Sequence, residues 1–379
     1  MPIFVDKTKL SSAYLPKRML HRDREKQLLT SILLSGVNRS NDFYVAKARV
    51  VGGVGVGKTT LCIMVGQEVE RTNKSVKHLY LNLRRFSTSK VTIYRHIVRS
   101  IAPDAYSPSL SAEELLDNLL LHLKNTGQRL LITFDDADYH VSARKGRESI
   151  LYDFVRLHEI SSIRPLNVVG VIFVFRDDDH GRFLEKSELS SLGASIVRLP
   201  DYTKQQLFDI LNDRVAEAFQ MGAVPISVVD YVAGVVSAPP YNGDVRFALD
   251  LLLHAGNIAE SSGLDSVRID DVRRVISEIY PSISSSELAE MSEEMRAAFL
   301  AVAKTLLSFD EASADIKKVK KTYEMICDLY GLSSSGFENA LKQLVLLGYV
   351  RSVGDGRLEI LRVDAGRLVE VLEPMLRTR

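Results

Sequence analysis

The chain has 379 residues, of which 46% are hydrophobic and 26% are charged, and its net charge at pH 7 is +1. This length predicts two or three domains, and the composition excludes a disordered chain. The small net charge excludes a uniformly basic nucleic-acid binder, so any such surface must be local. No apolar run reaches the ~20 residues of a membrane span, and the N-terminus lacks the layout of a secretory signal.

The two cysteines, Cys62 and Cys327, stand in apolar helical stretches far apart in the chain. Two isolated thiols of this kind are typical of a reducing compartment. We therefore expect a cytoplasmic protein that does not act at a membrane.

The first two hundred residues alternate between two hydrophobic periodicities. Short apolar, β-branched runs predict strands at 46–51, 77–83, 129–134, 168–175 and 195–199. Helical patterns separate them at 61–71, 91–101, 112–124 and 149–160. This alternation predicts an α/β fold with a parallel sheet that is covered on both faces.

The first predicted strand leads into Gly52-Gly53-Val54-Gly55-Val56-Gly57-Lys58-Thr59, which fits the phosphate-loop pattern GxxxxGK[ST]. Glycines let backbone N–H groups converge on the β- and γ-phosphates, the lysine adds a point charge, and the threonine hydroxyl binds Mg²⁺. The helical spacing that follows would place the phosphates at a helix N-terminus. We predict that ATP or ADP binds with Mg²⁺ at Gly55, Val56, Gly57, Lys58, Thr59 and Thr60.

The strand 129–134 ends in Asp135-Asp136-Ala137-Asp138. A buried strand that delivers a carboxylate to its C-terminal end is typical of Mg²⁺ sites in this fold, so Asp135 joins Thr59 as a predicted metal ligand. Asp136 stands where a water-activating base is expected, and we assign Asp135 and Asp136 as the catalytic pair. Aspartate is one methylene shorter than glutamate, which predicts poor reach to the attacking water.

After Pro200 only helical patterns follow, at 204–219, 226–236, 243–261 and 269–279, until a Pro- and Ser-rich break at 280–286. Three further helices are predicted at 292–307, 316–330 and 335–347, and then a hairpin with strands 350–353 and 358–363. This order predicts a helical lid and a C-terminal winged-helix domain. The predicted domains are therefore 1–200, 201–282 and 283–379.

The third helix of this tail has a natural N-cap at Ser333–Ser335 and a predicted apolar stripe of Leu341, Leu344, Val345 and Leu347. Asn339, Lys342 and Gln343 are left facing outward, where such a helix reads the major groove. Arg351 and Arg357 on the hairpin would contact phosphates. Lys317, Lys318, Lys320 and Lys321 form a basic cluster. Winged helices also mediate protein contacts, so both interpretations remain open.

Across nearly its whole length the chain resembles the archaeal origin-recognition initiators, AAA+ ATPases related to the eukaryotic origin recognition complex and its helicase-loading cofactor. Besides the phosphate loop and the Asp135 strand, the resemblance lies in 14–23, 200–207 and 243–252, and in the tail at Tyr323, Cys327, Gly331, Phe337, Leu341, Leu344 and Gly348. It implies that Tyr202 and Arg214 contact the nucleotide and that Arg246 touches the γ-phosphate. It also implies an initiator at the nucleoid that binds origin duplex DNA and helps to recruit the replicative helicase, with initiator paralogues as further partners.

Three positions depart from this family. Asp136 replaces the usual glutamate, Arg176 stands where an asparagine orients water, and Ser187 occupies the position of an inter-subunit arginine. Because an arginine supplied in trans is worth several orders of magnitude in rate, its loss predicts a weak ATPase that acts as a slow ATP/ADP switch.

Two other function classes remain open. One is a P-loop regulatory ATPase whose winged helix mediates protein contacts, and the other is a clamp- or helicase-loader subunit, which Ser187 disfavours. The basic segment from Arg84 to Arg99 likewise has two interpretations. Relatives use an element at this position to press on the DNA backbone, but a solvated helix with Ile93, Ile97 and Ile101 inward explains it equally well.

Overall fold

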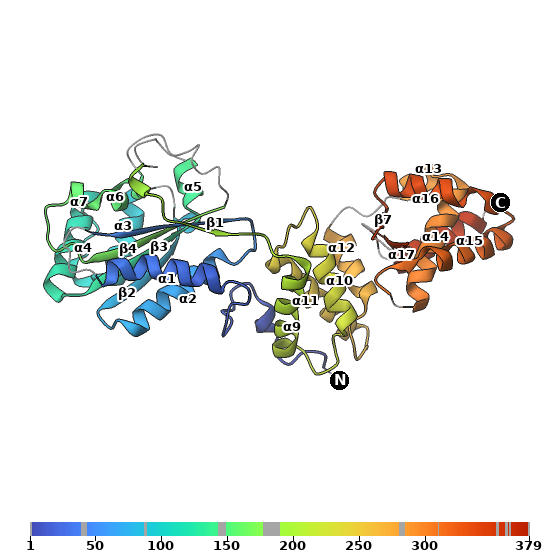
Figure 1. Ribbon diagram of the computed structural model, residues 1–379, viewed down its shortest axis with the longest axis horizontal. Helices are drawn as coiled ribbons and strands as arrows, with labels where there is room; N and C mark the ends of the chain where they lie inside the picture. Colours follow the sequence, from blue (N-terminus) through green and yellow to red (C-terminus); the bar gives the residue numbers. More distant parts are fainter. Residues whose placement is uncertain are drawn as a thin grey trace. The chain divides into compact units, whose positions relative to one another are not determined.

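The computed structural model, drawn in Figure 1, describes residues 2–38, 44–86, 89–142, 149–176, 190–279, 285–309, 311–353, 356–360, 363 and 365–377. These residues fall into two compact units, one formed by Leu15–Tyr202 and the other by Met1–Tyr14 with Thr203–Arg379. Ser187, residues 280–284 of the break predicted at 280–286, and the hairpin residues Gly354 and Asp355 lie outside the described residues.

A parallel sheet forms the centre of the first unit. Within the described ranges it has five strands in the order β2-β3-β4-β1-β5, and every neighbouring pair is parallel. This confirms the predicted α/β fold. The strands are β1 (Ala46–Gly52), β2 (Val76–Asn82), β3 (Arg129–Asp135), β4 (Val168–Phe175) and β5 (Ile196–Leu199).

Helices cover both faces of this sheet, which is why β4 is buried along its whole length. On one face, α3 (Lys90–Ile101), α4 (Ala112–Thr126), α6 (Ile150–Val155) and α7 (Leu157–Ile160) share an apolar core with Phe134 and Phe173. On the other, α1 (Asp23–Val37) and α2 (Lys58–Thr72) contact each other and the strands, as the blue helices of Figure 1 show.

Two helices of this unit differ from the sequence prediction. The pattern at 149–160 predicts one helix, but Arg156 leaves the helical conformation (φ −113°, ψ 25°) and separates α6 from α7. The helix α1 was not predicted, although Leu29 and Leu33, one turn apart, are both fully buried. A short helix, α5 (Ala137–Ser142), follows the acidic end of β3.

The second unit begins with helices α9 (Lys204–Ala218), α10 (Ile226–Ser237), α11 (Val245–Ser261) and α12 (Ile269–Ile279). The N-terminal segment packs here, although the sequence analysis places residues 1–200 in one domain. The Phe4 and Phe219 rings lie 4.6 Å apart, and Lys7, in the short helix η1 (Lys7–Leu10), pairs with Glu260 of α11 at 2.9 Å.

A winged-helix arrangement follows in the same unit. After α13 (Ser285–Glu290), its elements are α14 (Glu293–Phe309), β6 (Ala314–Asp315), α15 (Ile316–Tyr330), α16 (Phe337–Leu346), β7 (Val350–Ser352), β8 (Arg357–Ile360) and α17 (Ala365–Arg377). The strands pair antiparallel in the order β6-β8-β7. Phe299, Tyr323, Phe337 and Leu344 lie in its core.

The helix α16 starts two residues later than predicted, because Ser334–Gly336 form a 3₁₀ turn in front of it. Its buried residues are Phe337, Ala340, Leu341 and Leu344, the i, i+3, i+4, i+7 set of a helix that begins at Phe337. The prediction that Val345 and Leu347 complete the apolar stripe is wrong, since both are exposed near the end of the helix.

The lid helix α12 is tied to the winged-helix elements by a buried arginine. The Arg273 guanidinium, 3% exposed, donates to the carbonyl oxygens of Glu311 and Ala312 at 3.1 and 3.0 Å. On the same helix Asp270 accepts from the Ala365 N–H at 3.3 Å. The predicted division at 282/283 stays a prediction. In the described part of the chain, no helix is both long and apolar enough to cross a membrane.

Candidate functional site

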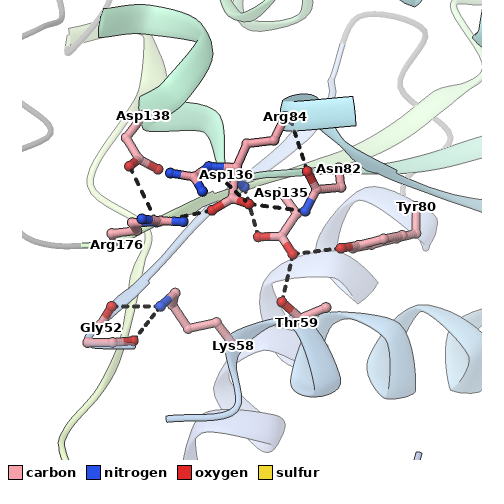
Figure 2. Close-up of polar contacts among 11 residues, drawn as sticks. Gly52, Lys58, Thr59, Tyr80, Asn82, Arg84, Asp135, Asp136, Asp138 and Arg176 are labelled. Carbon is pink, nitrogen blue, oxygen red and sulfur yellow. Dashed lines mark hydrogen bonds and ion pairs between the residues drawn. The ribbon is translucent and has the colours of Figure 1, made fainter. Parts of the chain in front are cut away.

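The phosphate loop joins β1 to α2. Gly55 (φ 70°) and Gly57 (φ 92°) adopt left-handed conformations that disfavour any side chain. Because Gly57 is the N-cap of α2 and has no side chain, the first N–H groups of the helix are left for an anion. Lys58 Nζ donates to the Gly52 and Gly53 carbonyl oxygens at 2.7 and 2.6 Å, which holds its charge within the loop (Figure 2).

Asp135, at the end of β3, is 4% exposed and forms a hydrogen bond with Thr59, the other residue predicted to bind the metal. One carboxylate oxygen accepts from Thr59 Oγ1 at 2.6 Å and from the Tyr80 hydroxyl at 2.7 Å. The other accepts from the Asp136 N–H at 2.8 Å. A hydroxyl and a carboxylate oxygen side by side are hard ligands that suit Mg²⁺, provided that phosphate and water oxygens complete the octahedron. These additional ligands are needed because the described residues contain no cluster of three or more His, Cys, Asp or Glu side chains that could hold a metal ion.

Tyr80 was not predicted as a site residue. Burial raises the pKa of its hydroxyl well above the ordinary value, and the neighbouring Asp135 charge raises it further. The hydroxyl therefore stays protonated and donates to Asp135 at every physiological pH. The role of Tyr80 follows from the pairing of β2 with β3, in which Tyr80 lies opposite Thr133, two residues before Asp135. A local sequence pattern does not contain this pairing.

Asp136, the predicted base, is surrounded by hydrogen-bond donors. Its carboxylate accepts from Asn82 Nδ2 at 3.1 Å and from Arg176 Nε at 3.2 Å, and Arg84 Nε lies 3.8 Å away. Its backbone is left-handed (φ 53°), a conformation that few non-glycine residues adopt. Figure 2 shows these side chains converging from the ends of β2, β3 and β4. The carboxylate of Asp136 thus lies beside two guanidinium groups and one side-chain amide.

Asp138 adds a third carboxylate, 4.0 Å from Arg176 Nε. Burial raises its pKa, and the Asp136 charge raises it as well, whereas its own backbone N–H, Arg176 and Arg84 lower it. The end of the sheet therefore combines three acidic groups with two guanidinium groups.

Tyr202 lies beside the phosphate loop in the first unit. Its ring is 3.8 Å from the guanidinium of Arg22, which is 1% exposed and donates to the Pro200 carbonyl oxygen at 2.5 Å. Burial raises the pKa of Tyr202. A methyl group on Gly57 would come within 2.3 Å of Met19 and 3.4 Å of the Tyr202 hydroxyl, so both side chains border the loop.

The two predicted arginine contacts belong to the second unit. Arg214, on α9, is 8% exposed, lies 4.6 Å from the Tyr14 ring and pairs with Glu217 at 3.1 Å. Arg246 is exposed on the first turn of α11, where Asp244 caps its N–H. Their assignment as nucleotide contacts stays a prediction.

The predicted DNA-binding residues differ in their surroundings. Asn339, Lys342 and Gln343 are exposed on α16, as expected. Arg351 pairs with Glu359 on the opposite strand at 2.7 Å. Arg357 pairs with Glu311 and donates to the Ser313 hydroxyl. Both wing arginines are thus held by acidic or polar neighbours of the chain itself.

The arginines of the basic segment after β2 (Arg84 to Arg99) lie in two different environments. Ile93, Ile97 and Ile101 are buried, as expected for an amphipathic helix. Arg95 donates to the Pro108 carbonyl oxygen and Arg99 to the Tyr106 hydroxyl, so both are held locally. Arg84 instead reaches Asp136 in the nucleotide site, which the local sequence gave no sign of.

Two protein-family profiles match the sequence. The Cdc6 AAA+ ATPase-type lid domain matches residues 208–277, and the AAA domain matches residues 48–181. The first match covers the four lid helices almost completely, and the second runs from β1 past the end of β4.

Curated and solved proteins extend this likeness. The chain is 29% identical over 284 residues to the ORC1-type DNA replication protein of Desulfurococcus amylolyticus, covering 73% of this chain and 68% of that protein. Its fold matches Cdc6p from Pyrobaculum aerophilum with a TM-score of 0.83 at 24% identity over 99% of both chains. It also matches the Aeropyrum pernix ORC1 protein in complex with DNA, with a TM-score of 0.63 at 25% identity over 99% of this chain and 97% of that one.

Proposed function

The chain belongs to the ORC1/Cdc6-type AAA+ proteins, and from this premise we propose that it is an ATP-dependent, DNA-binding replication initiator. In this proposal it recognises origin duplex DNA, acts as a slow ATP/ADP switch and helps to recruit the replicative helicase, with initiator paralogues as further partners. Its place of action is then the nucleoid within the cytoplasm.

The observation that carries the nucleotide part is the junction of three elements at one point. The carboxylate of Asp135 at the end of β3 accepts from the first hydroxyl of α2, Thr59 Oγ1, at 2.6 Å, and the loop lysine, Lys58, precedes Thr59 directly and is held on the loop carbonyl oxygens. ATP or ADP phosphates would occupy the loop N–H groups, and Mg²⁺ would bind at Thr59 and Asp135. When bound, the metal would neutralise charge on the phosphate oxygens.

Slow turnover is supported by the state of Asp136. A general base must reach the proton that it removes. This carboxylate is one methylene shorter than that of glutamate and is tied to the end of β2 by a hydrogen bond from Asn82. Bound ATP would therefore be hydrolysed slowly, and the state of the protein would depend on whether ATP or ADP is bound.

DNA binding is supported by the outward face of α16, which exposes Asn339, Lys342 and Gln343. Amide and amine groups on such a helix can reach base edges in a major groove. The Aeropyrum pernix ORC1 protein, a structural relative, is solved in complex with DNA. Arg351 and Arg357 would add phosphate contacts from the wing.

The alternative, a regulatory ATPase whose winged helix contacts proteins, is favoured by two observations. Both wing arginines are held by acidic partners, which reduces their attraction for phosphate. Leu346, at the end of α16, is 86% exposed, and Leu329 on α15 is 70% exposed, so each offers apolar surface that a protein partner would cover.

A duplex-binding assay over genomic fragments, with and without ATP, separates the two functions. The full chain should bind a subset of fragments, with an affinity that depends on the nucleotide, and a chain that ends before Ser286 should lose most of that affinity. If the shortened chain bound duplex DNA as well as the full chain, the winged helix would be a protein-contact module.

A further inference from the structure

Two guanidinium groups at the nucleotide site share the carboxylate of Asp136, and among the described residues Asp138 lies farther off, 4.0 Å from Arg176. Arg176 Nε lies 3.2 Å from one Asp136 oxygen, and Arg84 Nε lies 3.8 Å from the other, beyond hydrogen-bond reach. The Arg84 and Arg176 side chains are 47% and 41% exposed, whereas Asp136 is 18% exposed. The cations are therefore accessible to an incoming anion.

The sheet order places Arg176 beside the phosphate loop. The strand β4 lies between β3 and β1, and Phe175 pairs in register with Val51. The next residues along these strands are Arg176 and Gly52, and Gly52 begins the loop and accepts from Lys58. In Figure 2, Arg176 is drawn on the side of Asp136 that faces Gly52 and Lys58. The terminal phosphate of a nucleotide held by Lys58 and Thr59 would arrive in this region.

A terminal phosphate is a stronger partner for arginine than a single carboxylate is. It carries more charge and offers three oxygens, and a guanidinium group binds two of them side by side. ADP has no phosphate at this position, so the pairs with Asp136 would persist in the ADP state.

Resting on the proposed nucleotide-binding function, we propose that Arg84 and Arg176 form a γ-phosphate clamp for which Asp136 is the competing anion. On ATP binding the two guanidinium groups leave Asp136 for the γ-phosphate, and on ADP binding they stay. The clamp distinguishes ATP from ADP, and Asp136 sets the strength of that distinction instead of activating water.

The test compares the affinities for Mg²⁺·ADP and for Mg²⁺·β,γ-imido-ATP by calorimetric titration. Arg176→Ala should weaken binding of the triphosphate analogue by about 10- to 100-fold, the worth of one or two charge-assisted hydrogen bonds, and leave ADP affinity within about threefold. Arg84→Ala should act in the same direction with a smaller effect. Asp136→Asn, which removes the competitor, should strengthen binding of the analogue and leave ADP unchanged.

Arg71→Ala, on the last turn of α2, is the matched control and should change neither affinity. Arg176→Gln replaces Arg176→Ala if the alanine variant fails to fold, as judged by its thermal transition. Equal losses for ADP and the analogue would show a structural role and overturn the clamp. An unchanged or weakened analogue affinity in Asp136→Asn would overturn the competition. Nucleotide binding retained in Lys58→Ala would instead refute the proposed nucleotide site itself.

Discussion

At the scale of single residues, the phosphate loop depends on one cation. Lys58 Nζ is held by two loop carbonyl oxygens, and phosphate oxygens would take over these contacts. Lys58→Ala should abolish measurable binding of ATP and ADP, because it removes the charge that faces the phosphates. A fluorescent-nucleotide titration checks this. The thermal transition should match that of the unchanged protein, since Lys58 lies at the start of α2 and outside the core.

A second residue-scale prediction concerns His78 on β2. Burial lowers its pKa from 6.5 to about 4, the Lys77 charge lowers it as well, and the Glu70 charge acts in the opposite direction. Its ring nitrogen hydrogen-bonds Thr133 at 3.0 Å, and a methyl group on Gly66 would lie only 2.2 Å from the imidazole. The unfolded chain binds this proton more readily than the folded one.

Stability linked to His78 is therefore fully present above pH 6.5 and is lost as the pH falls toward about 4, at ~1.4 kcal/mol per pH unit. His78→Asn should flatten the dependence of the free energy of unfolding on pH within this window, as measured by urea titrations at several pH values. The same replacement at the exposed His158 serves as the control. An equally steep slope in the His78 variant would contradict the assignment.

At the scale of elements, α16 and the hairpin have separate expected roles in DNA binding. Lys342 is exposed on α16, so Lys342→Ala should weaken binding to the preferred site by about 1–3 kcal/mol and to a scrambled duplex by less. Arg357→Ala should weaken both duplexes about equally, because a phosphate contact carries no sequence information.

The measurement is a paired titration of both duplexes at two salt concentrations. Loss of the Arg357 phosphate contact should lower the salt slope by about one. Arg357 also holds Glu311 and Ser313, so the stability of this variant must be measured alongside. If Lys342→Ala affected both duplexes equally, α16 would not read the sequence.

At the scale of the whole molecule, turnover should not depend on assembly. Asp136 is one methylene shorter than glutamate and accepts a hydrogen bond from Asn82. The family resemblance predicts that Ser187 stands where relatives carry an arginine for a neighbouring subunit. We expect slow ATP hydrolysis, retained ADP and a specific rate that is nearly independent of protein concentration. A rate that rises steeply with concentration would mean that another subunit supplies a catalytic cation.

The lid and the winged helix are joined by contacts that local sequence patterns do not predict. Arg273 of α12 is buried and bonds two carbonyl oxygens in front of β6, and Glu311, one of those two residues, also pairs with Arg357 on the wing. Glu311 thus contacts the lid through its backbone carbonyl oxygen and the hairpin through its carboxylate.

The sequence by itself determined the α/β sheet, the phosphate loop and the helix order of the tail. These features depend on local periodicity and on a motif of eight consecutive residues, so the five strands of the parallel sheet begin and end within one residue of the predicted bounds. The contact between Thr59 and Asp135 also followed from the motif and the strand, because parallel strands bring their carboxyl ends to one edge of the sheet.

Only the tertiary structure decided which side chains share the nucleotide site and which cations are engaged. Tyr80, Asn82 and Arg84 reach Asp135 and Asp136 because β2 pairs with β3, residues more than fifty positions away. Arg84 therefore lies next to Asp136 in the nucleotide site, although the sequence groups it with the basic residues that follow β2. The wing arginines are paired for the same reason: Arg351 faces Glu359 across the hairpin, and Arg357 meets Glu311 beside β6. Such pairings follow from strand order and register, which a local pattern does not contain.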